Sequence, residues 1–275
     1  MNNMLHNLRH SLVNSTNPLF LIAIVFLLTL SSCTKTEDAV SQPKLLSKLV
    51  EVAADNSTTT TKFTYDGNKL VSTDANDKHA TYLYTNDLIT QIVVLDKTTQ
   101  LKSTLSYTYT NGALVKVVSS DNYVMTFTHN DDGTVSYEKH TTDINNNVIT
   151  LYSGKMHFQN GNLIEDERLL GGTAANIVSK NIMTYQYDAK TNPLQNIIGY
   201  SKLLDNFKTI SANNITRTQE ESRMEHTDTN QITSSDVLYV SANQYDADGY
   251  PTAITSEKTF FGEENTNHVK TELFY

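Results

Sequence analysis

The segment LSYTYTNGALV, residues 105–115, contains the pattern that decides the fold of this chain. Leu105, Tyr107 and Tyr109 alternate with Ser and Thr, so their side chains share one face of an extended strand. The pair Asn111-Gly112 follows and supplies the positive φ angles that a tight hairpin turn requires. Because a second apolar run begins directly after the turn, the segment predicts a β-hairpin with one buried face.

The same pattern recurs along the chain beyond residue 44. An aromatic residue precedes a turn and a second apolar strand in each unit, at Tyr65, Tyr84, Tyr109, Phe127, Phe158 and Tyr187. The spacing of these residues varies from 18 to 31, so the connecting loops differ in length. A series of such hairpins predicts an all-β fold, an antiparallel meander that forms one large twisted or curled sheet, either open or partly closed. Residues 44–275 are expected to form this single domain.

Two segments depart from the strand pattern. Asn192 suits a helix cap, Pro193 suits the first helical position, and apolar residues follow on one face, which predicts a short helix near residues 193–206. Residues 208–232 are polar and weakly patterned, which predicts one strand and a mobile loop.

Residues 1–32 resemble the signal peptide of a bacterial lipoprotein. The apolar run at residues 19–30 would span about 18 Å as a helix, which is short of the roughly 30 Å hydrocarbon core of a membrane. It ends in Leu30-Ser31-Ser32-Cys33, which resembles a lipobox, and Cys33 is the only cysteine of the chain. We therefore predict cleavage before Cys33, lipidation of Cys33 by acyl chains such as palmitate, and a lipidated tether at residues 33–43.

The tether also bears on localisation. Residue 34 is Thr and not the Asp that retains many lipoproteins at the inner membrane, so the resemblance implies an outer-membrane lipoprotein. Glu37 and Asp38 weakly resemble an acidic tag for export to the cell surface, and a generic polar tether is the alternative.

Composition and motifs argue against several classes of function. The net charge of −9, from 21 basic and 30 acidic residues, argues against a partner that is a nucleic acid. A single cysteine is incompatible with a disulfide framework or a cysteine-based zinc cluster. The sequence has no Gly-x-Ser-x-Gly, His-Glu-x-x-His or phosphate-binding loop. We therefore predict no catalytic residue, no enzymatic activity and no cofactor.

Three groups of polar residues were weighed as sites. Residues 246–249 begin like a calcium loop, but Pro251 stands where an EF-hand requires Gly, so we interpret them and residues 130–133 as hairpin turns. His129 and His157 would form a metal pair only on neighbouring strands. Glu165 and Glu167 share a strand face, which favours a solvated edge strand over a glycosidase-like pair. We predict no metal site.

Several dipeptides in strand-to-turn settings resemble YD repeats of RHS-type proteins, at Tyr65-Asp66, Tyr187-Asp188 and Tyr245-Asp246. With Asn192-Pro193 and the string Asp248-Gly249-Tyr250 added, roughly residues 60–275 resemble uncharacterised YD-repeat-like lipoproteins of Bacteroidota. The resemblance implies an extended β-meander on a lipid anchor, and it implies no reaction.

The expected function is that of a cell-envelope lipoprotein. Our first hypothesis is a non-enzymatic surface module that binds a protein or a glycan. The alternative is a periplasm-facing structural lipoprotein that stabilises an envelope complex. Tyr65, Tyr84, Tyr109 and Tyr187 occupy the same place in each repeat, so we expect them to pack in the core and not to contact a ligand. The terminal Tyr275 is expected to matter less for stability, because chain ends fray.

Overall fold

The computed structural model describes residues 44–172, 176–206, 210–260 and 267–275. The predicted signal peptide, the tether and Cys33 therefore lie outside the described residues. No helix in the described part of the chain is long and apolar enough to cross a membrane. Residues 43–275 form one compact unit.

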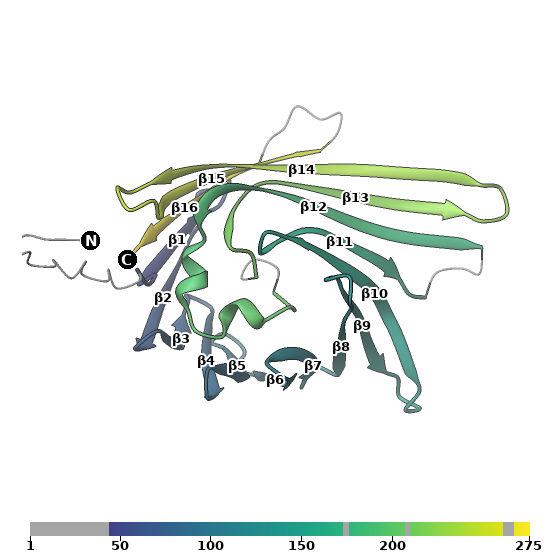
Figure 1. Ribbon diagram of the computed structural model, residues 1–275, viewed down its shortest axis with the longest axis horizontal. Coiled ribbons are helices and arrows are strands. Elements are labelled where there is room, and N and C mark those ends of the chain that lie inside the picture. The colour runs from purple at the N-terminus through teal and green to yellow at the C-terminus, as the bar shows by residue number, and fades with distance from the viewer. Residues whose placement is uncertain (1–43, 173–175, 207–209, 261–266) are drawn as a thin grey trace, which may run out of the picture. The chain divides into compact units, whose positions relative to one another are not determined.

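Sixteen antiparallel strands form a closed barrel, in which each strand pairs with its neighbours in sequence and β1 pairs with β16 (Figure 1). This confirms the predicted all-β meander and shows that the sheet closes completely. The strands are β1 (Lys48–Val52), β2 (Thr58–Asp66), β3 (Lys69–Asp74), β4 (Lys78–Thr85), β5 (Leu88–Asp96), β6 (Lys102–Thr110), β7 (Ala113–Ser119), β8 (Tyr123–His129), β9 (Val135–Thr142), β10 (Val148–Gln159), β11 (Asn162–Leu170), β12 (Ile177–Thr191), β13 (Asn213–His226), β14 (Gln231–Tyr245), β15 (Pro251–Phe260) and β16 (Asn267–Phe274).

Side chains alternate between the lumen and the outer surface. In β6, Tyr107 is buried and pairs with Val117 of β7, which is also buried, whereas Thr108 is exposed and pairs with Lys116. The same alternation places the apolar residues of most strands inside the barrel, where they form one core. Charged residues occupy outward positions around the wall, at Lys62, Asp74, Lys116, Glu138, Lys155, Glu165, Lys180, Glu221, Asp236, Glu257 and Lys270.

Four of the hairpins, β2–β3, β4–β5, β6–β7 and β10–β11, contain a β-bulge whose backbone is bonded by an aromatic side chain of another hairpin. The residue before each extra residue is fully buried, as at Leu70, Ile89, Leu114 and Leu163. The Tyr109 hydroxyl donates to the Ile89 carbonyl at 2.8 Å, and the Tyr84 hydroxyl accepts from the Leu70 amide at 3.0 Å. Because a bulge interrupts the ladder of backbone hydrogen bonds, these side chains stabilise the places where the sheet bends.

The same bond recurs around one end of the barrel. In three further cases a tyrosine hydroxyl donates a hydrogen bond to a backbone carbonyl. These are Tyr65 to Leu46, Tyr187 to Leu163 and Tyr275 to Pro251. His129 occupies this place in β8, with its ring nitrogen 2.9 Å from the Leu114 carbonyl, so the assignment of Phe127 to the repeat position was wrong by two residues. Tyr275 also belongs to this series, which argues against the prediction that it frays.

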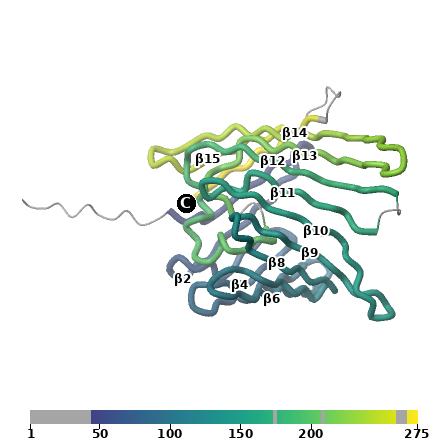
Figure 2. The backbone as a smooth tube through the Cα atoms, turned by 45° about the vertical axis from the view of Figure 1, so that its right-hand side comes forward, coloured from purple at the N-terminus to yellow at the C-terminus, as the bar shows by residue number. Residues whose placement is uncertain are grey.

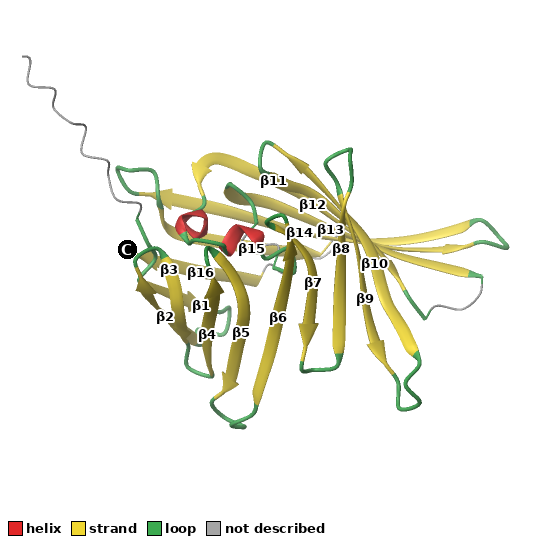
Figure 3. Cartoon of the chain, turned by 60° about the horizontal axis from the view of Figure 1, so that its bottom comes forward, coloured by secondary structure: helices red, strands yellow, loops and turns green. Residues whose placement is uncertain are grey.

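The predicted short helix is present as two 3₁₀ turns, η1 (Pro193–Asn196) and η2 (Tyr200–Lys202), with Asn192 capping the first. Gly199 separates them with a φ of +76°, and a Cβ there would lie 2.6 Å from the Asp87 carbonyl oxygen. A continuous helix is excluded by this left-handed residue. We call residues 193–206 and 210–212 the plug, because they lie inside the barrel (Figure 3), where Ile197 and Leu203 are each 1% exposed.

The plug lies at the end of the barrel that contains the β2–β3 and β4–β5 turns, since the Ile198 amide donates to the Asn68 carbonyl at 2.9 Å. We call this the plugged end, and the opposite end the mouth. Lys44, the first described residue, is at the plugged end, because it pairs with Asp246 and Asp248 in the β14–β15 turn at 2.7 and 2.5 Å.

The strand predicted within residues 208–232 is confirmed. The loop predicted beside it is limited, among the described residues, to 210–212 and the turn at 227–230, and residues 207–209 lie outside the described part. Residues 213–226 form β13, which pairs along its length with β12 and β14. These strands extend past their neighbours toward the mouth (Figures 1 and 2). In this part of the barrel the inward side chains, such as Ser222, Met224 and Thr233, are exposed to solvent. Because they do not pack on a core, these strands do not alternate between apolar and polar residues.

Candidate functional site

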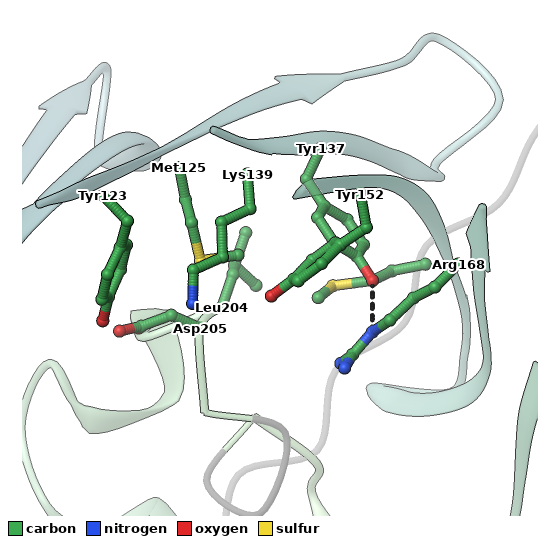
Figure 4. Close-up of a pocket in the computed structure, with 9 residues that line it drawn as sticks. Tyr123, Met125, Tyr137, Lys139, Tyr152, Arg168, Leu204 and Asp205 are labelled. Atoms are coloured by element: carbon green, nitrogen blue, oxygen red, sulfur yellow. Dashed lines mark hydrogen bonds between the residues drawn. The ribbon is translucent and has the colours of Figure 1, made fainter. Parts of the chain in front are cut away.

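A cavity of about 100 Å³ lies in the lumen between the plug and the mouth. Strands β8 to β11 form its wall and the tip of the plug contributes the remaining side (Figure 4). It is lined by Tyr123, Met125, Tyr137, Lys139, Tyr152, Met156, Arg168, Leu204 and Asp205. Tyrosines, cations and a carboxylate thus meet beside the apolar core of the lumen.

Arg168 is held by a buried network on one side of the cavity. Asp166 is 0% exposed and accepts from the Arg168 guanidinium, with Oδ2 at 2.7 Å from Nη2 and 3.0 Å from Nε. The Tyr137 hydroxyl donates to the other Asp166 oxygen at 2.5 Å and accepts from Arg168 Nε at 2.8 Å. Burial and the Asp166 charge raise the pKa of Tyr137 well above its ordinary value. The network fixes the guanidinium in the lumen.

Gly154 makes room for this network. It pairs with Tyr137 across β9 and β10, and a Cβ at Gly154 would lie 2.4 Å from the Tyr137 ring. The hydroxyl end of the Tyr137 ring therefore occupies the place that a side chain at residue 154 would take.

Lys139 supplies the second cation of the cavity. It pairs with Met125 and Tyr152, so its side chain points into the lumen. Its ammonium lies 3.7 Å from the ring centre of Tyr123 and 5.8 Å from that of Tyr152, in cation–π geometry. Burial, and then the charge of Arg168, lower the pKa of Lys139. Among the described residues, no carboxylate lies within the 4.0 Å that defines an ion pair with this lysine.

Asp205 at the tip of the plug supplies the carboxylate. Its Oδ2 accepts a hydrogen bond from the Tyr107 hydroxyl at 3.0 Å. Its Oδ1 is buried and has no hydrogen-bond partner within the described part of the chain. Burial raises the pKa of Asp205 above its ordinary value of 3.8. Two cations, one carboxylate and several aromatic rings therefore line the cavity.

The residues weighed from sequence do not form this site. His129 points inward, and its ring nitrogen contacts the Leu114 carbonyl. His157 points outward, and its Nε2 lies 3.8 Å from Glu165 Oε1. Strand β9 lies between the strands of the two histidines, so they form no metal pair. No group of three or more metal-ligating side chains occurs among the residues that the structure describes. Residues 246–249 and 130–133 are hairpin turns, as predicted.

Glu165 and Glu167 point outward as predicted, and Glu167 pairs with Lys180 at 2.7 Å. The edge-strand interpretation was wrong, because β11 pairs with β10 and β12 in a closed barrel. The functional interest lies in Asp166 between them, which the alternation turns into the lumen.

Tyr65, Tyr84, Tyr109 and Tyr187 pack against the core, as predicted. The sequence analysis did not single out Lys139, Arg168 or Asp205. A signal for Lys139 was present, since it stands two residues after Tyr137 and so shares its inward face.

The sequence matches no family model and no curated protein. Two solved structures are similar in fold. A porin-like protein from Bacteroides vulgatus ATCC 8482 is 15% identical with a TM-score of 0.52, and the match covers 84% of this chain and 98% of that one. A porin-like protein from Bacteroides uniformis ATCC 8492 is 12% identical with a TM-score of 0.51, covering 83% and 97%. At these identities the comparison establishes that the chain shares the barrel fold of these porin-like proteins.

Proposed function

We propose that this protein is an outer-membrane lipoprotein whose barrel lies in water beside the membrane and binds a ligand or partner through its mouth, without catalysing a reaction. The observation that carries the proposal is the polarity of the wall. A transmembrane barrel has an apolar band about 25 Å tall on its outer face and a polar lumen. In this barrel charged and hydroxyl side chains stand at outward positions on strands all around the wall, interspersed with exposed apolar residues such as Leu83, Val118 and Val240, and the lumen holds the apolar core.

The free-energy cost of placing this outer wall in a lipid bilayer supports a barrel that lies in water. Lysines point outward on five strands, at Lys62, Lys116, Lys155, Lys180 and Lys270. A lysine on the lipid face costs about 2–4 kcal/mol at the bilayer midplane, so five would cost about 10–20 kcal/mol there. Even if only some of these lysines lay near the midplane, the cost would be comparable to a typical stability of about 5–15 kcal/mol.

The chain enters the barrel at the plugged end. Ten residues lie between Cys33 and Lys44, so the eleven steps from one Cα to the next span at most about 40 Å when extended. Because Lys44 is bound at the plugged end, a lipid anchor at Cys33 would tether the barrel by that end.

The mouth has features of a binding surface. Apolar residues are exposed along its rim, with Ile144 97% and Val148 70% exposed. Exposed apolar clusters on soluble proteins mark places where a partner binds. We propose that the partner is a protein or a glycan, received at this rim and in the lumen behind it.

Labelling and protease treatment of cells test the proposal. A fatty-acid probe should label the wild type and not the Cys33→Ser variant, which should also leave the membrane fraction. Protease added to intact cells should remove the barrel from the surface. Equal labelling of both proteins would contradict the lipid anchor, and a barrel that is digested only after the outer membrane is opened would favour the periplasm-facing structural alternative.

A further inference from the structure

We propose that residues 44–47 form a strap that ties the start of the barrel domain to the plug, with Lys44 as its fastener, so that release of the strap loosens the plug. This device acts at the plugged end and is independent of what the mouth binds.

The strap is held by the fold although it precedes the first strand. Leu46 is 1% exposed, and its carbonyl accepts a hydrogen bond from the Tyr65 hydroxyl at 2.8 Å. The Ser47 amide donates to the Phe274 carbonyl at 2.7 Å, directly before the place where β1 and β16 close the barrel (Figure 1). The strap therefore continues the junction of the first and last strands toward the plugged end.

Lys44 fastens the beginning of the strap to the C-terminal part of the barrel. Its ammonium lies 2.7 Å from Asp246 Oδ2 and 2.5 Å from Asp248 Oδ2, both in the β14–β15 turn. The same ammonium lies 5.7 Å and 6.0 Å from the ring centres of Tyr250 and Tyr275, within reach of cation–π contact. Two carboxylates and two aromatic rings thus meet at one cation, which holds the strap in place.

Asn196, the last residue of η1, joins the strap to the plug. Its side-chain amide donates to the Lys44 carbonyl at 2.8 Å and to the Tyr250 hydroxyl at 3.1 Å. Lys44 therefore contacts the β14–β15 turn through its ammonium and the plug through its carbonyl. If the ammonium is released, η1 loses a hydrogen bond directly before Ile197, which is 1% exposed in the plug.

The test is hydrogen–deuterium exchange, followed by mass spectrometry, in the purified full-length protein in a neutral detergent, because exchange reports local opening. Lys44→Met removes the charge and keeps an unbranched side chain. It should speed exchange in peptides from residues 44–52 at least about threefold. Exchange in plug peptides from residues 193–206 should rise with it, while peptides from β6 and β7, residues 102–119, stay unchanged.

Three controls isolate the fastener. Lys44→Arg keeps the charge and should exchange like the wild type. Lys116→Met removes an exposed outward lysine on β7 and should change none of these peptides. Asp248→Asn removes one carboxylate partner that is 63% exposed, and it gives the same comparison if Lys44→Met fails to fold, which thermal unfolding reveals.

Asn196→Ala separates the plug from the strap. In this background Lys44→Met should still speed exchange in residues 44–52, but it should no longer change exchange in the plug, because the hydrogen bond that couples them is absent. An effect on the plug that is equal with and without Asn196 would contradict this coupling.

Three other results would overturn the proposal. Unchanged exchange in residues 44–52 of Lys44→Met would show that Lys44 fastens nothing. A loosened strap beside a plug that exchanges like the wild type would show that the two move independently. Faster exchange in residues 102–119 as well would show a loss of global stability in place of a local device.

Discussion

Removing the ring of Tyr109 should destabilise the barrel, because this residue bonds one hairpin to the bulge of the previous one. Its hydroxyl donates to the Ile89 carbonyl at 2.8 Å, and its half-buried ring packs against the core. Tyr109→Phe removes only the hydroxyl and leaves the Ile89 carbonyl without this donor. Tyr109→Ala removes the ring as well.

The magnitudes follow from these two contributions. A buried acceptor that loses its donor costs about 1–3 kcal/mol, so Tyr109→Phe should cost about 1 kcal/mol at this half-buried site. Replacement of a buried aromatic ring by Ala costs about 3–5 kcal/mol, and partial exposure places Tyr109→Ala near about 3 kcal/mol. For a domain of this size, each kcal/mol lowers Tm by about 2–4 °C. The Tm should therefore fall by about 2–4 °C in Tyr109→Phe and by about 6–12 °C in Tyr109→Ala.

The assay is thermal unfolding of the purified variants, followed by circular dichroism. Thr108→Ala is the matched control, because Thr108 is the exposed, outward neighbour on the same strand, and its effect should stay within about 0.5 kcal/mol. If Tyr109→Ala melts like the wild type, the ring is not part of the core. The tyrosine series would then be the leading candidate for a binding surface.

Three further changes probe the site. Gly154→Ala should cost about 1–3 kcal/mol in chemical denaturation, since its Cβ would meet the Tyr137 ring at 2.4 Å; unchanged stability would mean that the ring moves freely. Arg168→Leu should cost about 3–5 kcal/mol in the same assay, because it leaves Asp166 buried and unpaired, and a neutral effect would contradict the network. Burial raises the pKa of Asp205 above 3.8, so its ionised form costs stability at neutral pH. Relative to Asp205→Asn, the wild type should gain Tm as the pH falls from neutral toward about 4, and parallel pH profiles would refute this.

The local pattern predicted the hairpins but not their closure. Tyr107 and Tyr109 alternate with Thr before Asn111-Gly112, and these features specify one face and one turn without reference to the rest of the chain. Closure depends on the pairing of β1 with β16, residues that lie at opposite ends of the domain. The bulges at each hairpin curve the sheet, and no local sequence signal separates their extra residues from an ordinary strand.

The two errors of element assignment have a common cause. One strand was predicted within residues 208–232, but a mobile loop was expected beside it where the structure has a 14-residue strand at 213–226. Alternation in polarity is visible only where the inner face packs on a core, and this part of the lumen is exposed. The predicted helix near 193–206 is split because Gly199 approaches the Asp87 carbonyl of another hairpin. Both outcomes are set by tertiary contacts, which override local propensity.

The candidate site was beyond sequence reasoning for a similar reason. Lys139 and Arg168 come from strands β9 and β11, and Asp205 comes from a plug that folds back into the lumen. An inward lysine on a strand with apolar neighbours is a usable signal once the inward face is known. Asp205, the carboxylate that lines the same cavity, is identified only when the position of the plug is known.

The central claim, that the barrel lies in water and not in the membrane, is tested most directly by the solution behaviour of residues 44–275 without detergent. Size-exclusion chromatography with light scattering should give a single soluble species, with a strand-dominated circular dichroism spectrum and a cooperative thermal transition. A barrel that aggregates in buffer and becomes monodisperse only in detergent or lipid would contradict the claim, because its outer wall would then be a surface for lipid.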